Sequence, residues 1–190
     1  MAKVKLNPIL EQVRGSVGDL VFKRYGDDVI IAKKADMSDR EPSQAQLAAQ
    51  ERFRQAAMYG KMVMADPETK ALYADAARAK GKPVFSLTVA DFFHAPSVDE
   101  VDLSAYAGAV GDEIIIMASD DFDVLSVEVA LTTGDGNPIE SGEAVEAHAD
   151  SGRWVYTASA DVETGTTVRI AVTAQDRPGG ASTAEDEKAL

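Results

Sequence analysis

The segment SQAQLAAQERFRQAAMYGKMVMADPETKALYADAARAKG, residues 43–81, predicts two consecutive helices around which the rest of the chain is arranged. Ser43 suits the N-cap of the first helix, because its hydroxyl can accept a hydrogen bond from a first-turn amide. Asp66 followed by Pro67 indicates the start of a second helix. Gly81 indicates its end, since glycine readily adopts the left-handed conformation that closes many helices.

The apolar and small side chains of both helices recur at helical spacing. At about 100° per residue they form one stripe on the first helix, residues 43–65, and another on the second, residues 67–80. Each stripe should face a core, and the small residues would let the helices approach closely. The two stripes consist of Ala45, Ala49, Phe53, Ala56, Gly60, Val63 and Met64, and of Thr69, Leu72, Ala76 and Ala79, with Tyr73 beside the second.

The first helix also carries apolar side chains opposite its main stripe, at Leu47, Met58 and Met62. An amphipathic helix needs one apolar side, so a second side requires its own cover. Two interpretations remain open. Either the N-terminal segment of the same chain covers these side chains, or another subunit does.

Residues 1–36 predict an arm of short strands. Two β-rich runs, residues 20–25 and 29–32, are separated by the Gly-Asp-Asp of residues 26–28, which is typical of a hairpin. A lone hairpin is marginal in water, so it must pack on the helices or on a neighbouring subunit. The hairpin side chains predicted to take part in such an interface are Val21, Phe22, Tyr25, Val29 and Ile31.

Charge is divided unevenly along the 190 residues, whose formal net charge is −13. Residues 1–95 hold 15 Lys and Arg against 12 Asp and Glu, whereas residues 96–190 hold 4 against 20. The acidic half repels nucleic acid and anionic lipid and favours solubility. It is either a solvated surface or a face that meets the basic arm of another copy.

The composition excludes several kinds of chemical site and of targeting or membrane segment. The absence of cysteine excludes disulfides, thiolate metal sites and cysteine nucleophiles. No apolar run has the length of a secretory signal or a membrane-spanning helix. We therefore expect a soluble protein made in the cytoplasm, with no membrane partner.

From Val101 onward the apolar pattern has a period of two, as in residues 125–131 and 168–174. Such alternation is typical of strands with one buried face. Six or seven short strands separated by turn residues predict an antiparallel β-sandwich, with Trp154 in its core. The last residues, 181–190, have the polar composition of a flexible acidic tail.

Four stretches in this half resemble a bacterial immunoglobulin-like domain: ASDDFDV (118–124), VEV (127–129), WVY (154–156) and VTAQDRPG (172–179). The likeness covers residues 97–180. It implies a sandwich fold, but such domains serve as spacers, adhesive units and virion decorations, so it implies no single function.

The front half has a looser resemblance, carried by GSVG (15–18), VF (21–22), the basic hairpin and residues 46–53. These features are similar to those of conserved bacterial and phage proteins of no assigned activity. This resemblance implies no site residues.

Few residues suggest chemistry. The histidines, His94 and His148, lack a nearby acid-base pattern, and no glycine-rich stretch has phosphate-loop spacing, so we expect no enzyme. The best metal site is Asp120, Asp121 and Asp123, whose carboxylates could hold Ca²⁺, although the loop lacks full calcium-loop spacing. The alternative is that they are ordinary acidic loop residues.

The basic arm, residues 1–36, could also contact nucleic acid. Its lysines and arginines could contact phosphates, but its few aromatic residues and interspersed acids argue against nucleic acid as a partner.

Together these patterns predict an α+β protein. Its parts are a hairpin arm with two helices in residues 1–95, an immunoglobulin-like sandwich in 96–180 and a tail in 181–190. We expect a non-enzymatic structural protein that forms homo-oligomers or docks into a filament, shell or virion-like assembly through its arm and first helix. The alternative is a monomeric binding module whose loops recognise a protein or a glycan.

Overall fold

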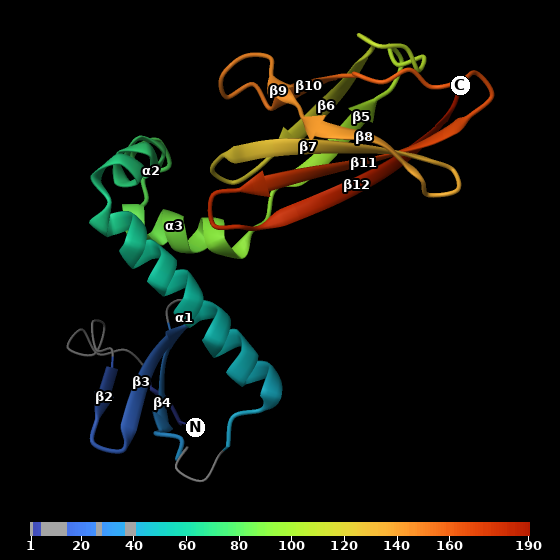
Figure 1. The fold of residues 1–190 in the computed structure, drawn as a ribbon. Coiled ribbons are helices and arrows are strands. Elements are labelled where there is room, and N and C mark those ends of the chain that lie inside the picture. The colour runs from blue at the N-terminus through green and yellow to red at the C-terminus, as the bar shows by residue number, and fades with distance from the viewer. Residues whose placement is uncertain (1, 5–14, 26–27, 37–40) are drawn as a thin grey trace. The chain divides into compact units, whose positions relative to one another are not determined.

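The computed structural model describes residues 2–4, 15–25, 28–36 and 41–190, and Figure 1 shows its elements. The chain forms two compact units, Met1–Leu47 and Ala48–Leu190, which are described separately. This division lies inside the first helix, whereas the sequence suggested a division near residue 95. The reason is that the helices make most of their contacts within the second unit.

The first unit contains a four-stranded antiparallel sheet. Its strands are β1 (Ala2–Val4), β2 (Gly15–Val17), β3 (Leu20–Tyr25) and β4 (Asp28–Lys33), in the order β1-β4-β3-β2. The β3–β4 pairing, with Tyr25 opposite Asp28, confirms the predicted hairpin. The hairpin is not isolated, however, since β1 and β2 extend it on both sides to a size that can be stable.

Helix α1 (Gln44–Ala65) begins as the sequence predicts. The Gln46 amide donates to Ser43 Oγ at 3.3 Å, and the Ser43 amide donates to Gln46 Oε1 at 2.9 Å. This reciprocal pair is a capping box, which satisfies two otherwise unpaired amides. The buried residues of α1 are Ala56, Gly60 and Val63, so only the second half of the predicted stripe faces a core.

Helix α2 (Pro67–Ala79) follows directly, with Asp66 as its N-cap, and ends at Gly81 in the left-handed conformation. Its buried face is centred on Tyr73 and Ala77. The predicted stripe through Leu72 was wrong, because α2 turns its larger aromatic side chain inward and leaves Leu72 half exposed. None of the described helices is long and apolar enough to cross a membrane.

Helix α3 (Val84–Phe93) lies across α1, at Gly60. A Cβ at that glycine would come within 2.8 Å of both the Phe85 ring and Thr88 Oγ1, so the missing side chain permits the close approach. Val63, Tyr73, Ala77 and Leu87 form a small core among the three helices.

The sandwich comprises two four-stranded antiparallel sheets, in the orders β5-β6-β10-β9 and β12-β11-β7-β8 (Figure 1). This topology corresponds to the ABED and GFC sheets of an immunoglobulin-like sandwich with one added strand. It agrees with the predicted fold and by itself identifies no family. The strands are β5 (Ser97–Asp102), β6 (Glu113–Ser119), β7 (Val124–Thr133), β8 (Pro138–Glu143), β9 (Val145–Glu146), β10 (Arg153–Thr157), β11 (Thr167–Asp176) and β12 (Ala181–Ala189).

The core of the sandwich follows the predicted alternation. Val127, Val129 and Leu131 on β7 are fully buried, and the inward residues of the neighbouring strand β11 lie beside them on the same face of the sheet. Trp154 also lies in this core, as its position predicted. Leu125 departs from the pattern because it lies at a shift in the register between β7 and β11, and it is half exposed.

The predicted tail is wrong, because its residues form β12. This strand pairs with β11 from Ala181 opposite Gln175 to Ala189 opposite Thr167. Lys188 Nζ donates to the carbonyl oxygens of Leu103 and Tyr106. Residues 181–190 have the polar composition of a tail because β12 is an edge strand. Charged residues are normal on the exposed face of such a strand.

The sandwich contacts the helices through the β6–β7 turn. Phe122 in this turn stacks on Tyr73 of α2, with ring centroids 3.9 Å apart and an interplanar angle of 13°. Lys80 donates to the carbonyl oxygen of Asp121, and Asp121 pairs with His94 at 2.5 Å. The residues of this turn thus contact both α2 and the end of α3.

Candidate functional site

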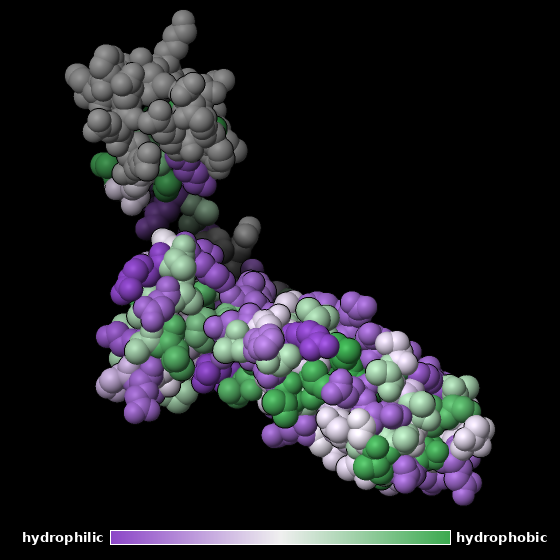
Figure 2. Space-filling model, turned by 90° about the horizontal axis from the view of Figure 1, so that it is seen from above, coloured by the Kyte–Doolittle hydropathy of each residue, from purple (hydrophilic) through white to green (hydrophobic). Residues whose placement is uncertain are grey.

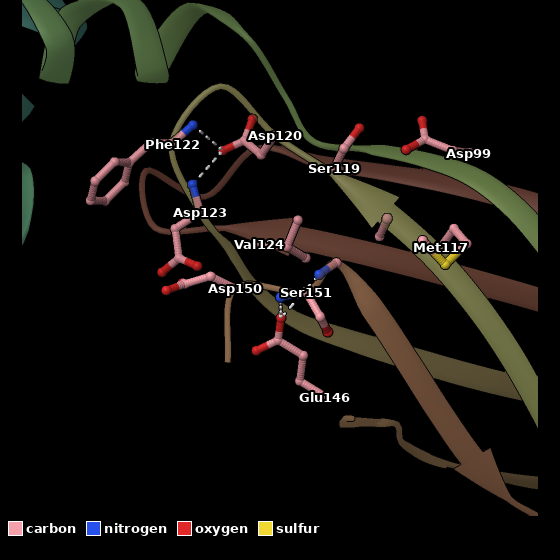
Figure 3. Close-up of a pocket in the computed structure, with 12 residues that line it drawn as sticks. Asp99, Met117, Ser119, Asp120, Phe122, Asp123, Val124, Glu146, Asp150 and Ser151 are labelled. Atoms are coloured by element: carbon pink, nitrogen blue, oxygen red, sulfur yellow. Dashed lines mark hydrogen bonds between the residues drawn. The ribbon is translucent and has the colours of Figure 1, made fainter. Parts of the chain in front are cut away.

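An acidic hollow of about 310 Å³ lies where β6 passes into β7 (Figure 3). Its walls come from the ends of β5 and β6, the β6–β7 turn and the β9–β10 loop. Among the residues that line it there is no lysine or arginine. The carboxylates that line it are Asp99, Asp120, Asp123, Glu146 and Asp150.

Several of these carboxylates are fixed by short-range hydrogen bonds. Ser97 Oγ donates to Asp99 at 2.6 Å, which lowers the pKa of Asp99. Glu146 accepts from the amides of Ser151 and Gly152 at 3.0 and 3.2 Å. Asp150 has a positive φ of 58° and no partner among the described residues. The hollow therefore concentrates negative charge and can attract a cationic group.

The three aspartates predicted to bind calcium have separate partners. Asp120 Oδ2 accepts weakly from the amides of Phe122 and Asp123, Asp121 pairs with His94, and Asp123 pairs with Arg177 at 3.0 Å. In the described parts of the chain, no group of three or more Asp, Glu or His side chains is placed to hold a metal ion. The geometry therefore gives no support to the calcium prediction.

A buried hydrogen-bond chain lies behind the hollow, between the helices and the sandwich. The Tyr73 hydroxyl donates to Asp91 Oδ2, and Tyr59 Oη lies 2.8 Å from Tyr73 Oη. Because each hydroxyl has one hydrogen, Tyr59 donates to Tyr73 when Tyr73 donates to Asp91. Helices α1, α2 and α3 each contribute one member of this chain.

The ionisation of Asp91 is strongly affected by its surroundings. Asp91 is 0% exposed, and burial raises its pKa to about 7, opposed by the Tyr73 hydrogen bond and reinforced by Asp120 and Asp176. Burial also raises the pKa of Asp176, although the amides of Gly180 and Gly179 oppose this. The junction thus holds more acid groups than it can stabilise as anions.

The predicted interface residues have different degrees of exposure. In α1, Leu47, Met58 and Met62 are exposed, the last two by 60% and 62%. In the arm, Val29 is buried, whereas Val21, Phe22 and Ile31 are half-buried. The Tyr25 side chain lies outside the described part of the chain. Their role in an interface stays a prediction.

A second hollow, of about 280 Å³, adjoins one of these residues. Met62 and Tyr59 of α1 form one side, Leu125 of β7 lies opposite, and Arg177 and Asp66 add charged groups. Arg177 is held by Asp123, to which its Nε and Nη2 both donate. The apolar surface around Met62 therefore continues from the helix onto the sandwich.

The sequence did not indicate Tyr59, Tyr73 and Asp91 as a group. They lie on three helices, and their association depends on how the helices pack. One signal was present: Asp91 interrupts the apolar run VFSLTVADFF of α3. A carboxylate in such a run is either paired or functionally important.

Comparisons with known proteins identify no family. No protein-family model and no curated protein matches the chain. One solved structure, titled "Crystal structure of Br derivative BhCBM56", is similar over 44% of this chain and 85% of its own, with 18% identity and a TM-score of 0.31. A similarity of this size supports no conclusion about shared function.

Proposed function

We propose that this protein is a non-enzymatic structural protein that associates with other copies of itself through α1. The observation that carries the proposal is the exposed apolar surface of this helix. Met58 and Met62 are four residues apart, so they lie on the same face of α1. Met62 also lines a hollow together with Leu125 of β7, so this apolar surface continues from the helix onto the sandwich.

The distribution of exposed apolar side chains favours assembly over binding by the sandwich loops. Among the described residues, α1 carries the largest share of them. Leu47, Met58 and Met62 share one side of the helix, and Phe53 and Met64 lie on the opposite side. On the sandwich they are dispersed, and Figure 2 shows apolar and polar side chains intermixed on the face it presents. Isolated apolar residues are normal, whereas contiguous ones mark contact sites.

The division of charge favours a second copy as the partner. Residues 1–95 carry 15 basic and 12 acidic residues, whereas residues 96–190 carry 4 and 20. A contact that places the front half of one copy beside the sandwich of the next is electrostatically favourable. Such a heterologous contact generates a ring or a filament.

The test compares two surfaces of similar exposure. We expect the wild-type protein to associate at micromolar concentration in ~0.15 M salt, and the double variant Met58→Ser, Met62→Ser to be monomeric, by sizing with light scattering. Val145→Ser is the matched control, because Val145 is 71% exposed but lies on β9. This control should associate like the wild type.

Two results would reject the proposal. One is a wild-type protein that is monomeric at micromolar concentration, and the other is a Val145→Ser control that weakens association as much as the double variant does. Raising the salt to ~1 M should weaken the association, because it screens the contact between unlike charges. Association that salt leaves unchanged would contradict the head-to-tail arrangement.

A second candidate function rests on the acidic hollow: a monomeric module that binds a basic segment of another protein. The hollow holds five carboxylates and no basic side chain. A glycan is less suited to the sandwich, because Tyr106, Trp154 and Tyr156 are buried and Phe122 is stacked on Tyr73. Among the aromatic rings of residues 97–190, only Phe122 is partly exposed, and one of its faces is occupied by Tyr73. A monomeric wild-type protein in the experiment above would favour this function.

A further inference from the structure

Two carboxylate oxygens at the junction of the helices and the sandwich are buried without a hydrogen-bond partner among the described residues. They are Asp91 Oδ1 on α3 and Asp120 Oδ1 in the β6–β7 turn. A buried acceptor without a donor is costly, and a buried anion is more so. The two carboxyls lie near each other, because Phe122, two residues after Asp120, stacks on Tyr73, whose hydroxyl donates to Asp91. Besides burial, the proximity of Asp120 also raises the pKa of Asp91.

The groups on the helices provide no donor for these two atoms. On α2, the Tyr73 hydroxyl gives its hydrogen to Asp91 Oδ2, the other oxygen of that carboxyl. On α1, Tyr59 lies against Tyr73 and not against either aspartate oxygen. The tyrosines therefore satisfy one oxygen of Asp91 and leave the other without a donor.

The groups on the sandwich provide none either. Arg177, after β11, donates its Nε and Nη2 to Asp123. Asp176 is a further acid, and its Oδ1 already accepts from the amides of Gly179 and Gly180. Both unpartnered oxygens are acceptors, and the described groups around them supply no hydrogen to either.

We propose that Asp91 and Asp120 share one proton, and that this proton fastens α3 to the β6–β7 turn and makes the helix–sandwich junction sensitive to pH. The proton turns one carboxyl into a donor and the other into its acceptor, so both unpartnered oxygens are satisfied at once. When it is lost, two negative charges face each other in a buried site, with Asp176 as a third acid nearby.

The sign of the effect follows from the direction of the pKa. Burial raises the pKa of Asp91 to about 7, so the folded state binds the proton more tightly than the unfolded chain, where an aspartate titrates near ~3.9. The stabilisation is complete below the unfolded pKa and is lost as the pH rises through about 7. Within this window the ratio of folded to unfolded protein falls about tenfold per pH unit.

The test uses the full chain and measures the melting temperature between ~pH 5 and ~pH 8. Over this range, the wild type should lose about a hundredfold in the ratio of folded to unfolded protein, or roughly 5–10 °C. Asp91→Asn supplies a permanent amide donor to Asp120 and keeps an acceptor for Tyr73. It should be more stable than the wild type at pH 8 and lose this pH dependence.

Asp150→Asn is the matched control, because it removes one carboxylate of the hollow that has no partner among the described residues. Its melting temperature should follow the wild type, which separates the shared proton from the general effect of net charge. Asp120→Asn places the amide donor on the other member of the pair, and it should have the same effect on stability and pH dependence as Asp91→Asn.

A site-specific measurement completes the test. In carbon-detected NMR, the side-chain carboxyl of Asp91 should titrate well above the ordinary range of an aspartate. Titration of Asp91 near ~pH 4 would overturn the proposal. So would parallel melting curves for the wild type, Asp91→Asn and Asp150→Asn.

Discussion

The sandwich and the helices place their apolar residues by different rules. In the sandwich, the inward residues of β7 and β11 alternate strictly and are fully buried, because the two sheets cover each other. On α1 and α2, apolar side chains at helical spacing divide between a small core and the solvent. A strand pattern therefore identifies a core directly. A helix pattern identifies a face, and the partner decides whether that face is buried.

The largest test of this difference is removal of residues 181–190. If they were a tail, as their composition suggests, the deletion would have no effect. Since β12 pairs along β11 and Leu190 packs on the sandwich core, we expect a loss on the order of 5 kcal/mol, or failure to fold. Chemical unfolding with circular dichroism would measure it.

A control for this deletion keeps the strand and changes only its charge. Glu185→Gln with Glu187→Gln removes two exposed carboxylates of β12 and should be close to the wild type. If the deletion and the control had equally small effects, the assignment of β12 would be contradicted.

A smaller effect separates the two regions by single side chains. Ile170→Ala empties a fully buried position of β11 and should cost about 2–5 kcal/mol. Leu72→Ala, on α2, removes a side chain that is 50% exposed and should cost less than about 1 kcal/mol. Urea unfolding of the two variants would compare them, and equal losses would contradict the proposed difference in burial.

The sequence was most informative where a local interaction determines the structure. Ser43, Asp66 and Gly81 determine helix ends through their own side chain or backbone, and all three lie where predicted. The alternation of β7 and β11 identified the sandwich for the same reason. A period-two pattern requires one buried face, whatever covers it.

The sequence was least informative where distant segments meet. The buried chain of Tyr59, Tyr73 and Asp91 depends on the packing of three helices against one turn. The aspartates of that turn suggested calcium because they are adjacent in sequence. In the structure Asp121 and Asp123 pair with His94 and Arg177, which lie far from them along the chain.

The test with the smallest expected effect compares two glycines at which an added Cβ would be too close to neighbouring atoms. At Gly152, in the β9–β10 loop, φ is +65° and a Cβ would lie 2.7 Å from the carbonyl oxygen of Ala118. Gly152→Ala should therefore cost about 2 kcal/mol, because neither the backbone angle nor a backbone atom can adjust cheaply. At Gly60, the obstacles are the side chains of Phe85 and Thr88.

Gly60→Ala should cost about 1 kcal/mol, because alanine recovers helix propensity and the partly exposed Phe85 ring can move, whereas the buried Thr88 hydroxyl must give way by a small shift. Thermal unfolding of both variants measures the difference. A larger loss at Gly60 than at Gly152 would show that the contact between α1 and α3 is the more rigid one. In that case the helices would be packed as tightly as the sandwich, and the contrast between the two regions would be limited to their surfaces.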